Sequence, residues 1–250
     1  MSEITLYEEL SINARPAIKV HLYDGWILQF ANGYTNRFNS VNMIYPSKIN
    51  PLEKIKFCEE IYTSLDLATI FKLTPLSIDS LDMVFEERGY KKTALFNLMA
   101  APLTMRNTFE TKAIITSTIN HIWQENHLRL NNISVKSDIE TEKAIQANTR
   151  NKILYASIVE SGTTVASGFC VIEREYAGLF GIVVDSNRRG KGLGLDICTS
   201  LLNSAVKKGV KFAYTQVAAD NTPIVALCGK LGFTNCYQYW YRIKDNFRTV

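Results

Sequence analysis

A glycine-rich, basic segment contains the residue types that most clearly indicate chemistry in this chain. Residues 183–194 read Val-Val-Asp-Ser-Asn-Arg-Arg-Gly-Lys-Gly-Leu-Gly, and an amphipathic helix is expected directly after them. Glycines let backbone amides approach a ligand closely, and a helix N-terminus carries about half a positive charge. Arg188, Arg189 and Lys191 strengthen the same field. The segment therefore predicts a diphosphate-binding loop.

The glycine spacing excludes the two commonest nucleotide-binding loops. A Walker A loop requires Ser or Thr after Gly-Lys, whereas Lys191 is followed by Gly192. A dinucleotide fingerprint requires G-x-G-x-x-G, and Gly194 is too close to Gly192 for that pattern. The carboxylate expected about twenty residues further on is also missing, since residues 206–209 read Val-Lys-Lys-Gly.

The loop resembles the acetyl-CoA signature of the GNAT N-acetyltransferase superfamily, Arg/Gln-x-x-Gly-x-Gly/Ala, because residues 189–194 read Arg-Gly-Lys-Gly-Leu-Gly. Residues 221–233, Asn-Thr-Pro-Ile-Val-Ala-Leu-Cys-Gly-Lys-Leu-Gly-Phe, are similar to the superfamily's Asn-x-x-Ala-x-x-Leu-Tyr-x-Lys-Leu-Gly-Phe helix. The resemblance covers about residues 110–250. It implies an α/β (α+β) fold with a mixed, mostly antiparallel sheet flanked by helices. It also implies direct transfer of an acetyl group from acetyl-CoA to a bound amine, without a metal.

The resemblance further indicates which residues would contact acetyl-CoA. Backbone groups of two valines would pair with the pantetheine arm, and the loop amides with an arginine side chain would bind the diphosphate. Asn221 would hydrogen-bond the arm, cap a helix, or do both. The expected cofactor-binding residues are Val183, Val184, Arg189, Gly190, Lys191, Gly192, Leu193, Gly194, Leu195 and Asn221.

Protonation of the leaving thiolate is where the sequence departs from the superfamily pattern. Cys228 stands at the position of the usual tyrosine. A thiol with a pKa near 8.5 could donate a proton there, and packing as a small apolar residue is the alternative. Tyr237, Tyr239 and Tyr241 lie nearby in the sequence and could replace the phenol, or pack as strand aromatics.

No general base for the amine is visible before the glycine loop. Residues 176–182 contain no carboxylate, and Glu173 and Glu175 lie in the preceding turn, too far from the expected thioester. A lysine-like amine is neutral in only about one molecule in 10³ at pH 7, roughly 4 kcal/mol uphill. We therefore expect a water chain or an acceptor of lower pKa. A non-catalytic acyl-CoA-binding or sensing module and an acetyl carrier through Cys228 are the rival hypotheses.

The acceptor site is expected beside splayed middle strands, where the two halves of the chain meet. Residues 24–40 mix glycines, aromatics, amides and an arginine, a composition suited to polar ligands. Arg37, Asn39 and Ser40 are the candidate substrate-binding residues. The sequence does not distinguish an amine on a small molecule from one on a peptide.

Composition restricts the other functions. The 250 residues are 46% hydrophobic and 21% charged with a net charge of +4, which is typical of a soluble domain and predicts no nucleic-acid partner. No apolar run is long enough to span a membrane, and residues 1–4 lack an export signal. Five cysteines without a CxxC pair indicate reduced thiols in a cytoplasmic protein, and the three histidines lack metal-ligand spacing. The oligomeric state stays unpredicted.

Hydrophobic periodicity predicts a catalytic GNAT domain at residues 110–250. Helices are expected at residues 137–147, at 192–208 and from 221 onward, and strands at 152–159, 164–173, 176–184, 211–217 and 237–243. Ser137 is the expected N-terminal cap of the first helix. A turn is expected at residues 160–163.

Residues 1–105 predict a second, degenerate GNAT-like domain, with the boundary at residues 101–110. Its helix, strand, helix and strand, expected at residues 53–65, 68–73, 77–90 and 93–99, follow the order of the C-terminal half. Gly89-Tyr90 stands where Gly232-Phe233 stands. Residues 45–51 contain two prolines and no glycine in place of the cradle, so this half should not bind CoA. A mixed α/β lobe of accidental similarity is the alternative.

Overall fold

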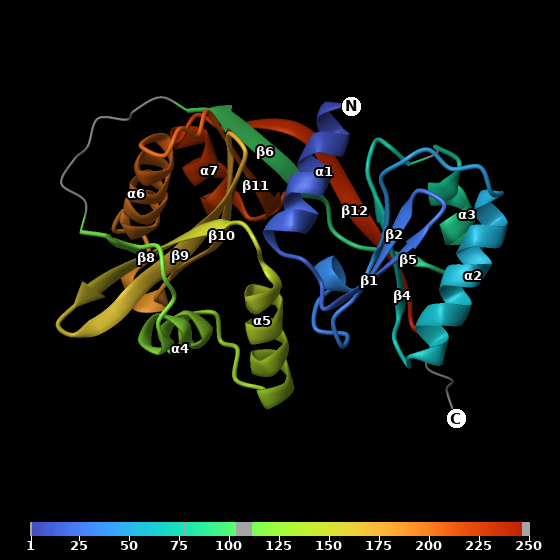
Figure 1. Cartoon of the computed structure of the whole chain (residues 1–250), viewed down its shortest axis with the longest axis horizontal. Helices are drawn as coiled ribbons and strands as arrows, with labels where there is room; N and C mark the ends of the chain where they lie inside the picture. Colours follow the sequence, from blue (N-terminus) through green and yellow to red (C-terminus); the bar gives the residue numbers. More distant parts are fainter. Residues whose placement is uncertain (1, 78, 104–111, 247–250) are drawn as a thin grey trace.

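In the computed structural model, which describes residues 2–77, 79–103 and 112–246, helices cover both faces of a long 12-stranded sheet (Figure 1). The strands are β1 (Lys19–Tyr23), β2 (Trp26–Phe30), β3 (Val41–Met43), β4 (Thr69–Leu73), β5 (Lys91–Lys92), β6 (Phe96–Pro102), β7 (Ile114–Thr116), β8 (Lys152–Glu160), β9 (Thr163–Glu173), β10 (Tyr176–Val184), β11 (Phe212–Ala218) and β12 (Thr234–Lys244). The helices are α1 (Glu3–Ala14), α2 (Pro51–Ser64), α3 (Leu81–Glu87), α4 (His121–Leu130), α5 (Lys136–Asn148), α6 (Leu193–Val206) and α7 (Thr222–Lys230). The strand order is β1-β2-β3-β4-β12-β6-β11-β10-β9-β8-β7, and β5 also pairs with β12.

The sheet consists of two units with the same strand pattern. In the C-terminal unit, β8, β9 and β10 are antiparallel neighbours, and β10 pairs with β11 in parallel. In the N-terminal unit, β1, β2 and β3 are antiparallel neighbours, and β3 pairs with β4 in parallel. Helices α6 and α7 flank β11 in the chain as α2 and α3 flank β4. The repeated order predicted from the sequence is thus visible in the strand pairing.

The two units exchange a strand. The N-terminal strand β6 lies between β11 and β12, whereas the last residues of β12, 240–244, lie between β4 and β5. In Figure 1, β12 accordingly runs from the C-terminal unit into the N-terminal unit. Helix α1 also packs against β9 and β10, although it begins the chain. Each unit is therefore completed by residues from the other half of the sequence.

A matching helix end supports the internal repeat. Gly89 after α3 and Gly232 after α7 have φ angles of 81° and 76°, in the left-handed region that favours glycine. The N–H groups of the following aromatics, Tyr90 and Phe233, donate to carbonyls five residues earlier at 2.9 and 3.0 Å. Both rings are buried. The same chain reversal therefore ends the equivalent helix in each unit.

Helix α6 shows how sequence periodicity positions the candidate site. Leu193, Ile197, Leu201 and Ala205 recur every four residues and form a buried stripe against β8, β9 and β10. Burying a large aliphatic side chain contributes roughly 1.5–3 kcal/mol, so the stripe holds the helix firmly on the sheet. The N-terminus of α6 is thereby fixed at the end of β10.

Most predicted elements coincide with observed ones, and three expectations need correction. Ser137 lies inside α5, whose N-cap is Val135. The helix expected at residues 77–90 is shorter, because α3 spans Leu81–Glu87. The strand expected at 93–99 is replaced by two strands, β5 and β6, which pair with different parts of β12. The expected boundary falls mainly on residues 104–111, which lie outside the described residues.

Candidate functional site

The two sequence motifs meet around a cavity of about 690 Å³ between the end of β10, the N-terminus of α6 and α7. The expected cofactor-binding residues in its wall are Val183, Val184, Arg189, Gly190, Gly192, Leu193, Gly194, Leu195 and Asn221. Lys191 is the expected residue that does not line it. The fold therefore brings separate sequence blocks to one site.

An opening in the sheet forms one side of this cavity. Strand β10 pairs with β11 only over residues 176–178, and β11 then continues along β6. On its other edge, β10 is irregular between Phe180 and Val183 against β9, and Gly181 in this irregular stretch has φ 59°. The end of β10 therefore presents, within the described residues, a backbone edge without a strand partner. Such an edge can hydrogen-bond an extended ligand.

The turn before α6 is shaped to expose backbone amides. Gly190 and Gly192 have φ angles of 78° and 82°, and a Cβ on either would meet nothing within 4 Å. The first N–H groups of α6, at residues 193–195, have no acceptor within the helix. Arg188 is paired with Glu160 at 3.0 Å. The exposed Arg189 and Lys230 side chains and the helix N-terminus therefore supply positive charge at the cavity.

Helix α7 forms the opposite wall. Asn221 caps it, since its Oδ1 accepts from the Ile224 N–H at 3.4 Å. A Cβ on Gly194 would lie 3.1 Å from Leu227 Cδ1, so the glycine allows α6 and α7 to approach closely. The capping role expected for Asn221 is confirmed, and its side chain also lies in the cavity wall.

Cys228 lies in the hydrophobic core beside the cavity. Its side chain is 4% exposed and belongs to the core cluster between the sheet, α6 and α7. Burial raises the pKa of the thiol to about 11, so it is protonated at neutral pH. Cys228 is not part of the cavity wall. The structure therefore places this side chain in a packing position.

The other candidate acids and bases also lie away from the cavity. Tyr237 donates to Glu8 at 2.7 Å on the opposite face of the sheet. Glu173 accepts from Asn13, and Glu175 pairs with Lys211, both at the start of β10 rather than its end. No carboxylate lines the cavity within the described residues. Residues 2–77, 79–103 and 112–246 contain no group of three His, Cys, Asp or Glu side chains that could hold a metal ion. No helix in these ranges is long and apolar enough to cross a membrane.

His127 supports the irregular part of β10, although no spacing in the sequence singled it out. A Cβ on Gly181 would lie 2.8 Å from the imidazole of this buried histidine. His127 Nδ1 lies 2.8 Å from Ser167 Oγ. Burial lowers the pKa of His127 to about 4, so the ring is neutral at pH 7. The neutral His127 ring therefore packs against the irregular stretch of β10, next to the opening between β10 and β11.

In the N-terminal unit, a carboxylate of the chain itself fills the position equivalent to the glycine cradle. Asp24 Oδ2 accepts from the N–H groups of Lys48 and Ile49 at 2.9 and 2.8 Å and from Ser47 Oγ at 2.7 Å. These donors lower the pKa of the Asp24 carboxyl below its usual range. Lys54, fully buried at the start of α2, donates to the same carboxylate at 3.3 Å. The turn before α2 therefore already holds an anion.

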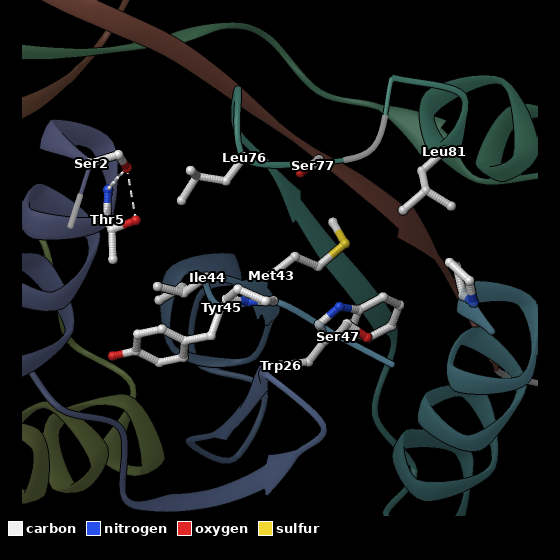
Figure 2. A pocket seen from close by; sticks show the side chains of 12 residues that line it. Ser2, Thr5, Trp26, Met43, Ile44, Tyr45, Ser47, Leu76, Ser77 and Leu81 are labelled. Carbon is white, nitrogen blue, oxygen red and sulfur yellow. Dashed lines mark hydrogen bonds between the residues drawn. The ribbon is translucent and has the colours of Figure 1, made fainter. Parts of the chain in front are cut away.

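A cavity of about 770 Å³ lies beside this turn, and its character differs from that of the C-terminal one. Figure 2 shows apolar side chains around it, among them Trp26, Met43, Ile44 and Leu76. Its wall contains no glycine and no arginine within the described residues. The cavity therefore lacks the glycines and the arginine that are expected to bind phosphate in the C-terminal unit.

The three expected substrate-binding residues have different environments. Asn39 holds its own loop, since Oδ1 accepts from the Ala31 and Gly33 N–H groups at 2.8 and 3.0 Å. Ser40 is fully buried. Arg37 instead lines a cavity of about 420 Å³ together with side chains from β6, β11 and β12. Among the three, Arg37 is the side chain that the structure places on a cavity.

Comparisons with known proteins identify the family and the fold of this chain. A family model described as the C-terminal part of the probable histone acetyltransferase Rv0428c matches residues 1–242. The uncharacterized N-acetyltransferase YobR of Bacillus subtilis is 26% identical over 250 residues, which cover 98% of this chain and 100% of that protein. A GCN5-related N-acetyltransferase structure from Kribbella flavida has a TM-score of 0.67 at 13% identity and covers 96% of this chain and 94% of its own. A tandem GNAT protein from the clavulanic acid biosynthesis pathway has a TM-score of 0.63 at 11% identity, with coverages of 84% and 76%.

Proposed function

Because this chain belongs to the Rv0428c C-terminal family, within the GNAT N-acetyltransferase superfamily, we propose that it transfers the acetyl group of acetyl-CoA to a primary amine of a small molecule or peptide. The observation that carries the proposal is the cavity where the free edge of β10, the glycine turn and the α6 N-terminus converge. Each of these features matches a different part of coenzyme A.

Different residues of the chain would bind different parts of acetyl-CoA. Backbone groups of Val183 and Val184 would hydrogen-bond the extended pantetheine arm as an added strand does. The N–H groups of residues 193–195 and the Arg189 guanidinium would bind the diphosphate. Asn221 would contact the arm from α7. This arrangement would fix the thioester at the opening between β10 and β11.

The amine would attack from the other face of the sheet and form the amide as the carbon–sulfur bond breaks, and coenzyme A would leave as a thiolate that takes up a proton from solvent. Because no described carboxylate lines this cavity or the cavity beside Arg37, water would remove the proton from the amine. The buried Cys228 would pack rather than donate a proton. Holding the two reactants together would be the main contribution of the protein to the rate.

Calorimetry and an assay of CoA release test the proposal. We expect acetyl-CoA to bind and a panel of primary amines to include at least one that is acetylated. Arg189→Ala should weaken acetyl-CoA binding about tenfold, because it removes a charged hydrogen-bond donor. Lys208→Ala, which removes one exposed charge beyond the other end of α6, should not change it.

The packed Cys228 and the missing carboxylate favour one alternative, a non-catalytic acyl-CoA-binding module. Tight binding of acetyl-CoA without turnover of any amine would support that alternative. Absence of acetyl-CoA binding would refute both functions.

We also propose that residues 110–250, with β6 completing their sheet, form the catalytic domain, and that residues 1–105 bind no CoA. The support is the internal carboxylate of Asp24 in the N-terminal turn. Calorimetry should therefore give one bound acetyl-CoA per chain, and a stoichiometry of two would contradict this.

A further inference from the structure

The cavity beside Arg37 lies at the junction of the two units, on the opposite face of the sheet from α6 and α7. Its volume is about 420 Å³, and its wall includes Arg37, Phe96, Gln216, Tyr239 and Tyr241. The two tyrosines belong to the core cluster that also contains residues of α1, rather than to the cluster beneath α6 and α7. This volume lies in the range of small-molecule sites.

The cavity is adjacent to the opening in the sheet. Arg37 Cζ lies 4.9 Å from the centre of the Phe180 ring. Phe180 is the last regularly paired residue of β10 before its irregular stretch. Gln216, on β11, lies beyond the last residue that pairs with β10. A molecule in this cavity would therefore lie beside the point where β10 and β11 separate.

Arg37 differs from the other cations near this cavity because it has no acidic partner among the described residues. Arg15 forms an ion pair with Glu142, and Lys72 forms one with Glu8 at 2.6 Å. Arg37 has one long hydrogen bond, 3.4 Å to the Ser11 carbonyl, and otherwise contacts aromatic rings. Burial, and to a smaller extent Arg15, lowers the pKa of its guanidinium.

An incompletely compensated guanidinium in a cavity favours an anionic ligand. Burial of a charge without a partner is costly, so a ligand that supplies the partner recovers part of that cost. The planar guanidinium matches the two oxygens of a carboxylate. A more highly charged phosphate would need further free cations, and Arg15 and Lys72 are already neutralised by glutamates.

We propose that Arg37 binds a carboxylate on the acceptor, so that the substrates are amines with a free carboxylate, such as amino acids or peptides. The assignment of Arg37 to acceptor binding rests on the proposed acetyl transfer, because the amine of the same molecule must reach the thioester. The rings of Phe96, Tyr239 and Tyr241 would contact the apolar part of the acceptor. Arg37 is thus assigned a role in substrate selection.

Binding can test this assignment independently of catalysis. The protein is saturated with CoA and titrated with amino acids of increasing side-chain size and with the carboxamide of each. At least one amino acid should bind, at least about tenfold more tightly than its carboxamide. Arg37→Gln should abolish this preference, whereas Arg37→Lys, which keeps the charge, should retain part of it. Arg150→Gln, which removes an exposed arginine after α5, should leave the preference intact.

The same pairs are then compared by acetyl transfer. We expect the preference for the carboxylate to appear in kcat/KM and to disappear in Arg37→Gln, with the Kd for acetyl-CoA unchanged. The inference would be overturned if no amino acid bound, or if acid and carboxamide bound equally well. It would also be overturned if Arg37→Gln weakened the binding of acid and carboxamide by the same factor. If carboxylates bind through Arg37 but no amine is acetylated, the carboxylate site stands and the proposed transferase function fails. Thermal melts of each variant show whether it is folded.

Discussion

Gly192→Ala separates the ligand-binding role of the glycine turn from its structural role. Gly192 has φ 82° at the start of α6, and Gly209 has φ 88° after its end. A Cβ at either position would meet nothing within 4 Å, so alanine introduces backbone strain without a clash. The strain is about 1–2 kcal/mol at each site. Gly209→Ala is therefore a matched control on the same helix.

Both variants should melt a few degrees below the wild type, because each loses a similar amount of stability. Only Gly192→Ala should weaken acetyl-CoA binding, since a strained backbone at the N-cap would misalign the N–H groups of residues 193–195 that are proposed to bind the diphosphate. Loss of one charged hydrogen bond costs about 1.5–3 kcal/mol, which corresponds to at least a tenfold rise in the Kd measured by calorimetry. Unchanged affinity in Gly192→Ala, or an equal loss in Gly209→Ala, would refute the assignment of the cradle.

Three further variants test other parts of the structure. Asp24→Asn should lower the urea midpoint at pH 7 more than the exposed Asp79→Asn does. Because the folded-state pKa of Asp24 is depressed, the difference between the two variants should shrink as pH falls below about 4. A difference that stays constant with pH would contradict the role of the Asp24 carboxylate. Glu8→Gln should cost about 3–5 kcal/mol in chemical denaturation, because it leaves Lys72 buried without its partner; a loss below 1 kcal/mol would argue against the pair. Cys228→Ala should lower stability by about 1 kcal/mol and leave kcat within about twofold, whereas a large fall in kcat in a fully stable variant would restore the proton-donor role.

The C-terminal elements could be predicted because their signals are local. The turn after β8 has positive φ at Ser161 and Gly162, as the Ser-Gly pair between alternating strands indicates. The apolar spacing in α6 and the glycine after it were sufficient to predict that helix. The glycine turn before α6 was also visible in the sequence, because its glycines coincide with the positive φ angles at Gly190 and Gly192.

Long-range pairing explains what the sequence did not reveal. Asp24 precedes Gly25 in a tight hairpin, and nothing local indicates that its carboxylate reaches the turn before α2. Asn39 is of a residue type that often binds ligands, but its side-chain amide forms hydrogen bonds with neighbouring backbone groups. The position of Arg37 beside Phe180 joins residues from different units. Such contacts depend on tertiary packing, which periodicity does not encode.

The exchanged strands have a consequence for how the chain matures during translation. The sheet that contains β4 cannot close until residues 240–244 have left the ribosome, although most of its other strands emerge much earlier. Nascent β4 and β5 therefore have unpaired edges until then, and the N-terminal unit cannot complete its sheet before the C-terminal half has been made.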